Sequence, residues 1–452
     1  MYFRTGEHVR AGRRQPPRYR NWQKQSNECL GLSKREDGFT PIGLQSWMHT
    51  RRMAQLRPDN YRRFKCPFGG GVTCMDLDKT EDRFLLAGAA DTTIALFDTH
   101  TVSEKAETLI APIFSYTRHT NAAAHKFMIS SVAWYPVDTG LFVTGSYDCN
   151  VKVWDTNEIE VVGTFQLPKK VTGVAMSLVA AAHTLIAASC EDTHVRLCDP
   201  TSGAITHVFS GHRDAVWCVA WSTCSEYEVL SGDGGGQIRL WDIRRAGCRA
   251  VFDQYCTQRP SRSASAEDPT MSMSPSKKQR RGGAAGAMHS SSSAPALLAP
   301  EPAASARMKE AAVRAHSGAV TCVLPCPDAL SLLSAGTDGR MRLWDAHSRV
   351  NKLVGYEGTH NRALRTRQLA VTGDARVVFY PTGSSMNIYE VGTGRMLASL
   401  QGGHTESINC CAYNPSTHEL YSGANDRVLR VWTVQPDADR MEDEDCEGGA
   451  KG

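Results

Sequence analysis

The sequence lacks the features that would place a protein in a membrane, in a secretory pathway or around a structural metal. No run of about 18 uninterrupted apolar residues occurs, so no membrane-spanning helix is expected. The Arg-rich N-terminus has no apolar segment of the kind found in secretory signals. None of the 15 cysteines forms a Cys-x-x-Cys pair, and several lie within apolar runs. We therefore expect reduced, buried thiols in an intracellular protein, with no disulfide framework, metal or cofactor.

Charge is spread unevenly behind a net value of +4. Residues 1–65 hold fifteen Lys and Arg against five Asp and Glu, whereas residues 436–452 hold two against seven. Of the 58 residues in 255–312, 33 are Ser, Ala, Pro or Gly, too little apolar surface to offset the entropy of ordering. We expect a basic disordered extension over residues 1–36, a disordered insertion over 255–312 and an acidic tail over 435–452. The basic segments can contact nucleic acid, serve as import signals or simply be solvated.

Between these segments a repeat is visible. Short β-prone runs end in Trp154-Asp155, Trp241-Asp242 and Trp344-Asp345, and degenerate copies place positions 97, 198, 389 and 432 in the same setting. Four of the six intervals are 43 to 45 residues, and the longer two equal one repeat plus an insertion. A four-stranded unit of this length is too small to bury its own faces, so we expect the seven units to pack together.

Two further markers keep step with the repeat: a His 28 or 29 positions before the aromatic position in four copies, and an Asp six before it in five. This pattern resembles the WD-repeat family of circular β-propellers. The resemblance implies an all-β, seven-bladed WD-repeat β-propeller in which His, Ser or Thr, Asp and Trp form buried tetrads. Because a nucleophilic site is normally built once, this repetition argues against a catalytic triad and against an enzyme. The tetrads expected are His125, Thr144, Asp148 and Trp154; His316, Ser334, Asp338 and Trp344; and His404, Ser422, Asp426 and Trp432.

A short N-terminal helical segment is expected before the propeller. Thr40 can cap a helix, Pro41 suits its first position and Pro58 stops it. Its apolar residues include Leu44, Trp47 and Met48, which either pack on the propeller or dock into a partner. The last repeat stops before a fourth strand, so we expect residues 63–68 to supply it and close the ring. The predicted organisation is a helical docking segment over residues 37–61 and the propeller over 62–434.

Several stretches narrow the resemblance to the Cockayne syndrome protein A family. They include residues 132–142 (VAWYPVDTGLF), 203–221, 336–344 and 409–422, and the similarity runs in order from about residue 39 to 434. The resemblance implies a nuclear substrate receptor of a cullin-4 RING ubiquitin ligase in transcription-coupled nucleotide excision repair. Its implied partners are the damaged-DNA-binding adaptor of the ligase, the Cockayne syndrome group B ATPase and stalled RNA polymerase II.

The same resemblance assigns adaptor contacts to Trp241, Asp242 and Arg244, and to the helix residues Leu44, Trp47 and Met48. A guanidinium suits carbonyl and carboxylate acceptors across an interface. An intrablade salt bridge from Arg244 to an Asp is the competing interpretation. Gly235 stands where the family usually has an acidic residue, and Asp233 is nearby but out of phase.

Two other hypotheses remain open. A WD-repeat scaffold in chromatin or RNA processing would keep the propeller without ligase association. Direct but weak DNA contact through the basic arm would show a steep salt dependence.

Overall fold

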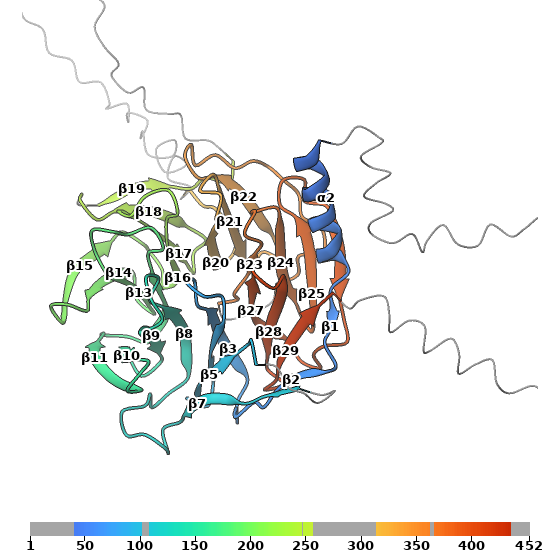
Figure 1. Ribbon diagram of the computed structural model, residues 1–452. Helices are drawn as coiled ribbons and strands as arrows, with labels where there is room; N and C mark the ends of the chain where they lie inside the picture. Colours follow the sequence, from blue (N-terminus) through green and yellow to red (C-terminus); the bar gives the residue numbers. More distant parts are fainter. Residues whose placement is uncertain (1–39, 102–107, 246, 256–312, 362–365, 435–452) are drawn as a thin grey trace, which may run out of the picture.

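The computed structural model describes residues 40–101, 108–245, 247–255, 313–361 and 366–434. In these ranges the chain forms seven antiparallel sheets arranged around a central channel, with one helix outside the ring (Figure 1). The all-β, seven-bladed WD-repeat β-propeller with a short N-terminal helical segment is confirmed. In each blade the first strand lines the channel, and strands follow one another outward to the rim.

The first four blades are complete sheets of four strands. Blade one comprises β3 (Val72–Leu77), β4 (Phe84–Ala89), β5 (Ile94–Asp98) and β7 (Pro112–Tyr116); blade two β8 (Ile129–Trp134), β9 (Leu141–Ser146), β10 (Asn150–Asp155) and β11 (Glu160–Gln166); blade three β12 (Val171–Met176), β13 (Ile186–Cys190), β14 (His194–Asp199) and β15 (Ala204–Ser210); blade four β16 (Val216–Trp221), β17 (Glu228–Asp233), β18 (Ile238–Asp242) and β19 (Cys248–Val251).

Blade five has three regular strands, and a single bridge from Trp344 to Asn351 takes the place of the fourth. Its strands are β20 (Val320–Pro325), β21 (Ser331–Gly336) and β22 (Met341–Asp345); blade six has β23 (Ala370–Val371), β24 (Val377–Thr382), β25 (Ser385–Glu390) and β26 (Met396–Leu400); blade seven has β27 (Ile408–Asn414), β28 (Glu419–Ala424), β29 (Leu429–Thr433) and β1 (Arg57–Pro58).

Burial follows the position of a strand within its blade. Every residue of β21 and β28 is buried, because neighbouring blades cover both faces of a second strand. The fourth strand β11 alternates between exposed and covered residues, as expected for a rim strand with one face in solvent. The core is therefore a ring of clusters between adjacent blades.

The ring closes through the chain segment that precedes blade one, but not through the residues expected. Arg57 and Pro58 pair with Trp432 and Thr433 of β29, and the Asp59 N–H donates to the carbonyl of Val431 at 2.8 Å. The prediction that residues 63–68 supply this strand is wrong. Residues Arg62–Phe64 form β2, which pairs in parallel with β6 (Thr108–Ile110) beside blade one. A two-residue strand carries no sequence periodicity, so the pairing register was not readable.

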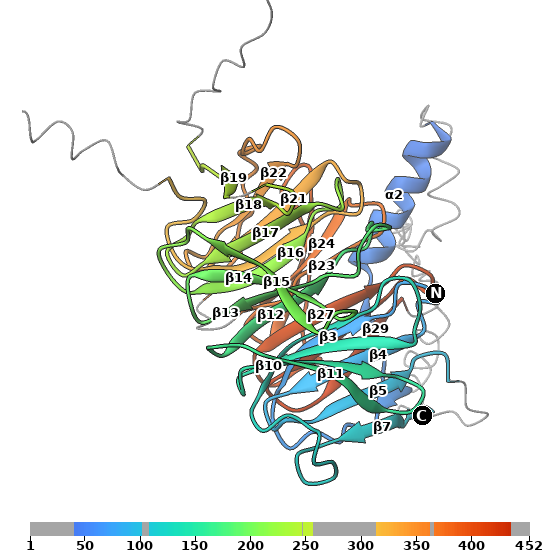
Figure 2. The same cartoon turned by 90° about the vertical axis from the view of Figure 1, so that its left-hand side faces the viewer.

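The antiparallel order gives the propeller two distinct faces. Turns between first and second strands and between third and fourth strands lie at one end of every blade, because those strand pairs reverse at the same edge. We call this the helix face, since α2 (Pro41–Ala54) packs on it (Figure 2). Second-to-third turns and the connections between blades form the opposite side, the insertion face, from which the chain leaves after Tyr255 and returns at Val313.

Candidate protein-docking face

The predicted tetrads are present and buried. In blade two, the His125 Nδ1 lies 2.8 Å from Asp148 and its Nε2 lies 2.7 Å from the Thr144 hydroxyl, to which the Trp154 indole N–H donates at 2.8 Å. Blades five and seven repeat the arrangement, with Trp-to-Ser distances of 2.8 and 2.7 Å. Each imidazole is fully covered, so these groups join the strands of a blade and are closed to a substrate.

A fourth tetrad, in blade four, was missed from the sequence. His212 lies 2.9 Å from Asp233 and 2.6 Å from the Ser231 hydroxyl, which accepts from the Trp241 indole at 2.7 Å. Asp233 stands two positions earlier than the Asp of the other tetrads, at the end of β17 instead of in the following turn. The glycine run after it allows this, because Gly236 has φ 87° and a side chain there would meet the carbonyl of His316.

Arg244 lies in the turn between β18 and β19, on the helix face. Its guanidinium makes two 3.0 Å hydrogen bonds to the carboxylate of Asp242 and lies 4.3 Å above the ring of Tyr227. The intrablade salt bridge considered from the sequence is therefore formed. It holds the guanidinium in place but does not bury it, since the Arg244 side chain is 56% exposed. The remaining N–H donors are free to meet acceptors from outside the chain.

Two residues assigned to the same contact set have a different place. Trp241 is fully buried and Asp242 is 2% exposed. Direct contact of Trp241 with a partner is excluded by this burial, and Asp242 can act only by orienting Arg244. Tyr227, whose ring packs against the guanidinium of Arg244, was not singled out in the sequence because it lies in a first-to-second turn, whose length differs from blade to blade.

The helix α2 begins as its sequence signals predict. The Thr40 hydroxyl accepts from the Gly43 N–H at 3.2 Å, and Pro41 occupies the first turn. Its C-terminal end is anchored, because Met53 and the following Leu56 are fully buried among side chains of blades six and seven. Leu44 and Trp47 remain partly exposed and Met48 is exposed. The helix therefore packs on its own propeller with one end and leaves apolar side chains uncovered at the other.

Polar contacts also fix the helix. The His49 Nδ1 lies 3.2 Å from Asp374 and its Nε2 lies 3.2 Å from the Tyr413 hydroxyl, while Arg376 contacts Ser46. Burial raises the pKa of Asp374, but hydrogen bonds from His49, Thr372 and the Arg376 N–H together outweigh this and hold the pKa well below its usual range. Asp374 follows β23 in a first-to-second turn. Since Arg244 follows a third strand, both lie on the helix face of the propeller.

Exposed apolar residues lie in first-to-second turns of the same face. They are Val137 in blade two, Leu178 and Val179 in blade three and Leu330 in blade five, each at least 45% exposed. Together with Arg244 and the uncovered residues of α2, they define a broad face with apolar and cationic character. In the sequence, this patch could have been predicted only from the turns, where an apolar residue stands among polar ones.

The described ranges also bear on metal binding and on membrane insertion. No group of three His, Cys, Asp or Glu side chains there is placed to hold a metal ion. Among the helical residues that the structure describes, none forms a segment long and apolar enough to cross a membrane.

Comparison with known proteins agrees with the repeat architecture. The "WD domain, G-beta repeat" family model matches residues 112–155, 203–242, 309–345 and 394–433. The chain is 40% identical to the WD repeat-containing protein ATCSA-1 of Arabidopsis thaliana over 407 residues, which is 85% of this chain and 90% of that protein.

More distant relatives match over shorter stretches. Radiation-sensitive protein 28 of Saccharomyces cerevisiae is 33% identical over 26% of this chain and 25% of its own length. A ribosome biogenesis protein WDR12 homolog of Aedes aegypti is 27% identical over 38% of this chain and 42% of its own length. Since the plant protein is matched over nearly the full length of both chains, the chain belongs to the Cockayne syndrome protein A family of WD-repeat proteins.

Proposed function

We propose that this chain is the substrate-recognition subunit of a cullin-4 RING ubiquitin ligase, acting in the nucleus in transcription-coupled nucleotide excision repair. Membership of the Cockayne syndrome protein A family supports the assignment. The observation that carries it is that α2 and Arg244, which are about 190 residues apart in the sequence, lie on one face of the propeller. An adaptor that binds both needs only a single continuous surface.

The geometry suits docking to the damaged-DNA-binding adaptor. Met53 and Leu56 hold one end of α2 against the propeller, so its orientation is set before binding. Leu44, Trp47 and Met48 stay available to enter an apolar groove. A helix that is ordered in advance loses less conformational entropy on binding, which favours affinity. Arg244, supported by Asp242, would add hydrogen bonds beside the helix.

In this proposal the protein performs no chemistry itself. It holds a client on the insertion face and thereby raises the effective concentration of that client near a ubiquitin-charged enzyme. The proposed clients are the Cockayne syndrome group B ATPase and RNA polymerase II stalled at DNA damage. Any direct contact with DNA would be weak.

The test is the affinity of the purified full chain for the purified adaptor. We expect Arg244→Glu, and separately Leu44→Asp with Trp47→Asp, to lower the affinity at least tenfold each. Arg213→Glu, the same charge change on the insertion face, is the matched control and should alter affinity less than twofold. Adaptor binding that survives the combined Arg244 and helix variants would overturn the proposal.

A WD-repeat scaffold in chromatin or RNA processing is the alternative, and similarity to ribosome biogenesis proteins over part of the chain favours it. Affinity purification of the full chain, with and without transcription-blocking damage, separates the two. Recovery of cullin-4 and its adaptor supports the ligase, whereas recovery of chromatin or RNA-processing complexes alone supports the scaffold.

A further inference from the structure

The inner strands share a local irregularity at the insertion face. In six blades the pairing register of the first strand shifts between its first and third residues, so that its second residue forms a bulge. These second residues are Thr73, Ser130, Thr172, Trp217, Thr321 and Asn409. All of them except Asn409 also line the channel.

Most of these residues serve to join the blades. Thr73 donates to the carbonyl of Ile129 at 2.6 Å, and Thr172 to that of Val216 at 2.7 Å. Ser130 and Asn409 likewise donate to carbonyls of the next blade, both at 2.7 Å. A short polar side chain at this position is therefore explained by ring assembly.

Two of the six residues depart from this pattern. Thr321 donates to the carbonyl of Ala335 in its own blade at 3.1 Å, and the residue in blade four is Trp217. It is partly exposed, it lines the channel, and no inter-blade hydrogen bond from its indole occurs among the described residues. At this end of the strand the thiol of Cys218 makes a long contact of 3.8 Å to the carbonyl of Val320, and the shorter join to blade five lies beyond the other end, where Thr223 donates to the carbonyl of Cys326 at 2.9 Å. The indole ring at the mouth is thus not required for assembly of the ring.

Arg367 in blade six, which precedes β23, is a second unusual residue beside the channel. Its backbone N–H donates to the carbonyl of Thr321 at 3.3 Å, which places it at the same mouth. One guanidinium nitrogen donates to the carbonyl of Pro381 at 3.2 Å, while its buried Nε has no hydrogen-bond partner. Within the described ranges no carboxylate lies at salt-bridge distance from it, and desolvation lowers the pKa of Arg367. A partly buried cation without a counter-charge is costly and is normally paired.

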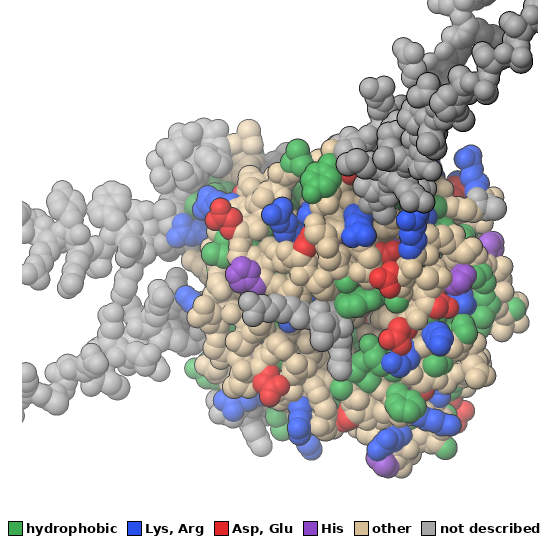
Figure 3. Space-filling model, turned by 180° about the vertical axis from the view of Figure 1, so that it is seen from behind, with side chains coloured by type: hydrophobic (Ala, Val, Ile, Leu, Met, Phe, Trp, Pro, Cys, Tyr) green, Lys and Arg blue, Asp and Glu red, His purple; other side chains and the backbone are tan. Residues whose placement is uncertain are grey.

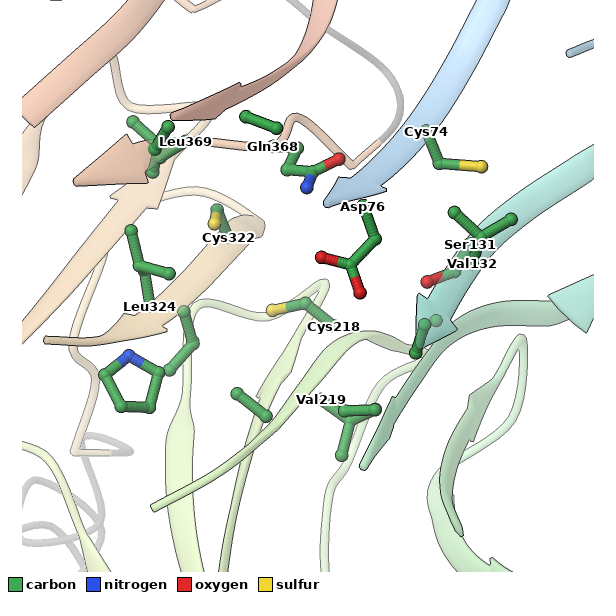
Figure 4. A pocket seen from close by; sticks show the side chains of 18 of the residues that line it. Cys74, Asp76, Ser131, Val132, Cys218, Val219, Cys322, Leu324, Gln368 and Leu369 are labelled. Atoms are coloured by element: carbon green, nitrogen blue, oxygen red, sulfur yellow. The ribbon is translucent and has the colours of Figure 1, made fainter. Parts of the chain in front are cut away.

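The space that these two side chains border is a channel of about 450 Å³ lined by all seven blades. Figure 4 shows side chains converging on it, among them Cys218, Gln368 and Asp76. The Asp76 carboxylate is already engaged, accepting from Lys79 at 3.0 Å and from the Trp134 N–H at 2.9 Å. Figure 3 shows that hydrophobic side chains gather near the middle of the insertion face, with basic and acidic side chains interspersed around them.

We propose that the channel mouth on the insertion face binds an acidic side chain of a partner polypeptide, with the carboxylate on Arg367 and an adjoining apolar group on Trp217. The two oxygens of a carboxylate lie in one plane and can both accept hydrogen bonds from the guanidinium of Arg367, which has no such partner among the described residues. The narrow, largely apolar channel admits a side chain, whereas a nucleic acid backbone would remain outside it. The site is separate from the helix face, so this inference does not require the adaptor.

The test uses the purified full chain and a phage-displayed library of random 12-residue peptides. Enriched peptides are synthesised and their affinities measured for the wild-type chain, Arg367→Leu and Arg213→Leu, a matched change at an exposed arginine of the same face. We expect the enriched peptides to share an Asp or Glu. Arg367→Leu should weaken binding at least tenfold and Arg213→Leu less than twofold.

A double-mutant cycle identifies the contact. Changing the shared Glu to Gln (or Asp to Asn) in the peptide should cost the wild-type chain the same factor and should cost Arg367→Leu nothing further. Trp217→Thr should weaken binding while the acidic requirement remains. The proposal would be overturned if the enriched peptides bound Arg367→Leu as tightly as the wild-type chain, or if their binding did not require the Asp or Glu.

Thermal unfolding separates this role from a structural one. Because Arg367 has no counter-charge among the residues that the structure describes, we expect Arg367→Leu to unfold at the wild-type temperature or above. A fall of several degrees would show that Arg367 serves folding and would also overturn the proposal. Neither result bears on adaptor affinity, which depends on the other face.

Discussion

His49 and Asp374 join two parts of the chain that are 325 residues apart in sequence, with 3.2 Å between the imidazole Nδ1 and the carboxylate. The contact links α2 to a turn of blade six. Because the helix carries the residues proposed to enter the adaptor, this pair sets how the docking surface is presented.

Removal of the pair should loosen the helix without unfolding the propeller. We expect His49→Ala to lower the free energy of local opening over residues 41–54 by about 1 kcal/mol, since Asp374 is 35% exposed and its charge is partly screened. Hydrogen exchange of the helix amides measures this. His347→Ala, at an exposed turn of blade five, is the control, and unchanged exchange in His49→Ala would contradict the prediction.

The ion pairs of Arg62, which lie next to the strand β1 that closes the ring, should contribute far more to stability than an ion pair on the surface. Arg62 donates to Asp59 at 3.0 Å and also contacts Glu419, and both carboxylates are 9% exposed. Arg62→Met would leave two buried charges unpaired and should lower the free energy of unfolding by about 3–5 kcal/mol. Urea denaturation measures the change.

The same substitution at a surface pair provides the comparison. Arg83 pairs with Asp98 at 2.6 Å but is 43% exposed, so Arg83→Met should cost less than about 1 kcal/mol. Equal losses in the free energy of unfolding for Arg62→Met and Arg83→Met would show that the ion pairs of Arg62 have no special role in ring closure.

The unusual position of Asp233 in the tetrad of blade four can be tested by moving the carboxylate to position 235, where the other tetrads have their Asp. Asp233→Ser leaves the buried His212 without its carboxylate and should destabilise the chain by about 1–3 kcal/mol. Adding Gly235→Asp restores the Ser-x-Asp order of blade two, where Ser146 and Asp148 occupy these places, and should recover part of the loss. The measurement is the free energy of unfolding in urea; no recovery would mean that the glycine turn cannot take the usual geometry.

Stability should fall as the solution is acidified from pH 7 to 5. Burial lowers the pKa of His316, against the opposing effect of Asp338, and the nearby Arg342 lowers it further. Burial also lowers the pKa of His404, which faces Asp426 and Arg430. With the folded pKa depressed, the unfolded chain binds more protons below about 6.5, so stability is full above that pH and is lost as the pH falls.

Urea denaturation at pH 7.5, 6.5 and 5.5 checks this slope. His404→Gln removes one of the two groups and should flatten the dependence while lowering stability at pH 7.5. A free energy of unfolding that is constant over this range would contradict the assignment of neutral, buried imidazoles.

Local pattern was enough for the blades, because each is a unit of consecutive strands whose markers lie within one repeat. The tetrads around Trp154, Trp344 and Trp432 could be identified for this reason, and the cap of α2 at Thr40 followed from its first four residues. Asp233 escaped the same search because the phase of a marker is fixed only where the turn length is fixed.

The sequence alone was sufficient to predict the number of repeats and the polar tetrads of blades two, five and seven. Only the tertiary structure decided which two residues close the ring, that Trp241 is buried while Arg244 remains exposed, and that Arg244 and α2 share a face. The difference arises from the distance along the chain over which each interaction acts. Hydrophobic period and turn chemistry act over a few residues, whereas ring closure pairs segments more than 370 residues apart, and no local pattern encodes that register.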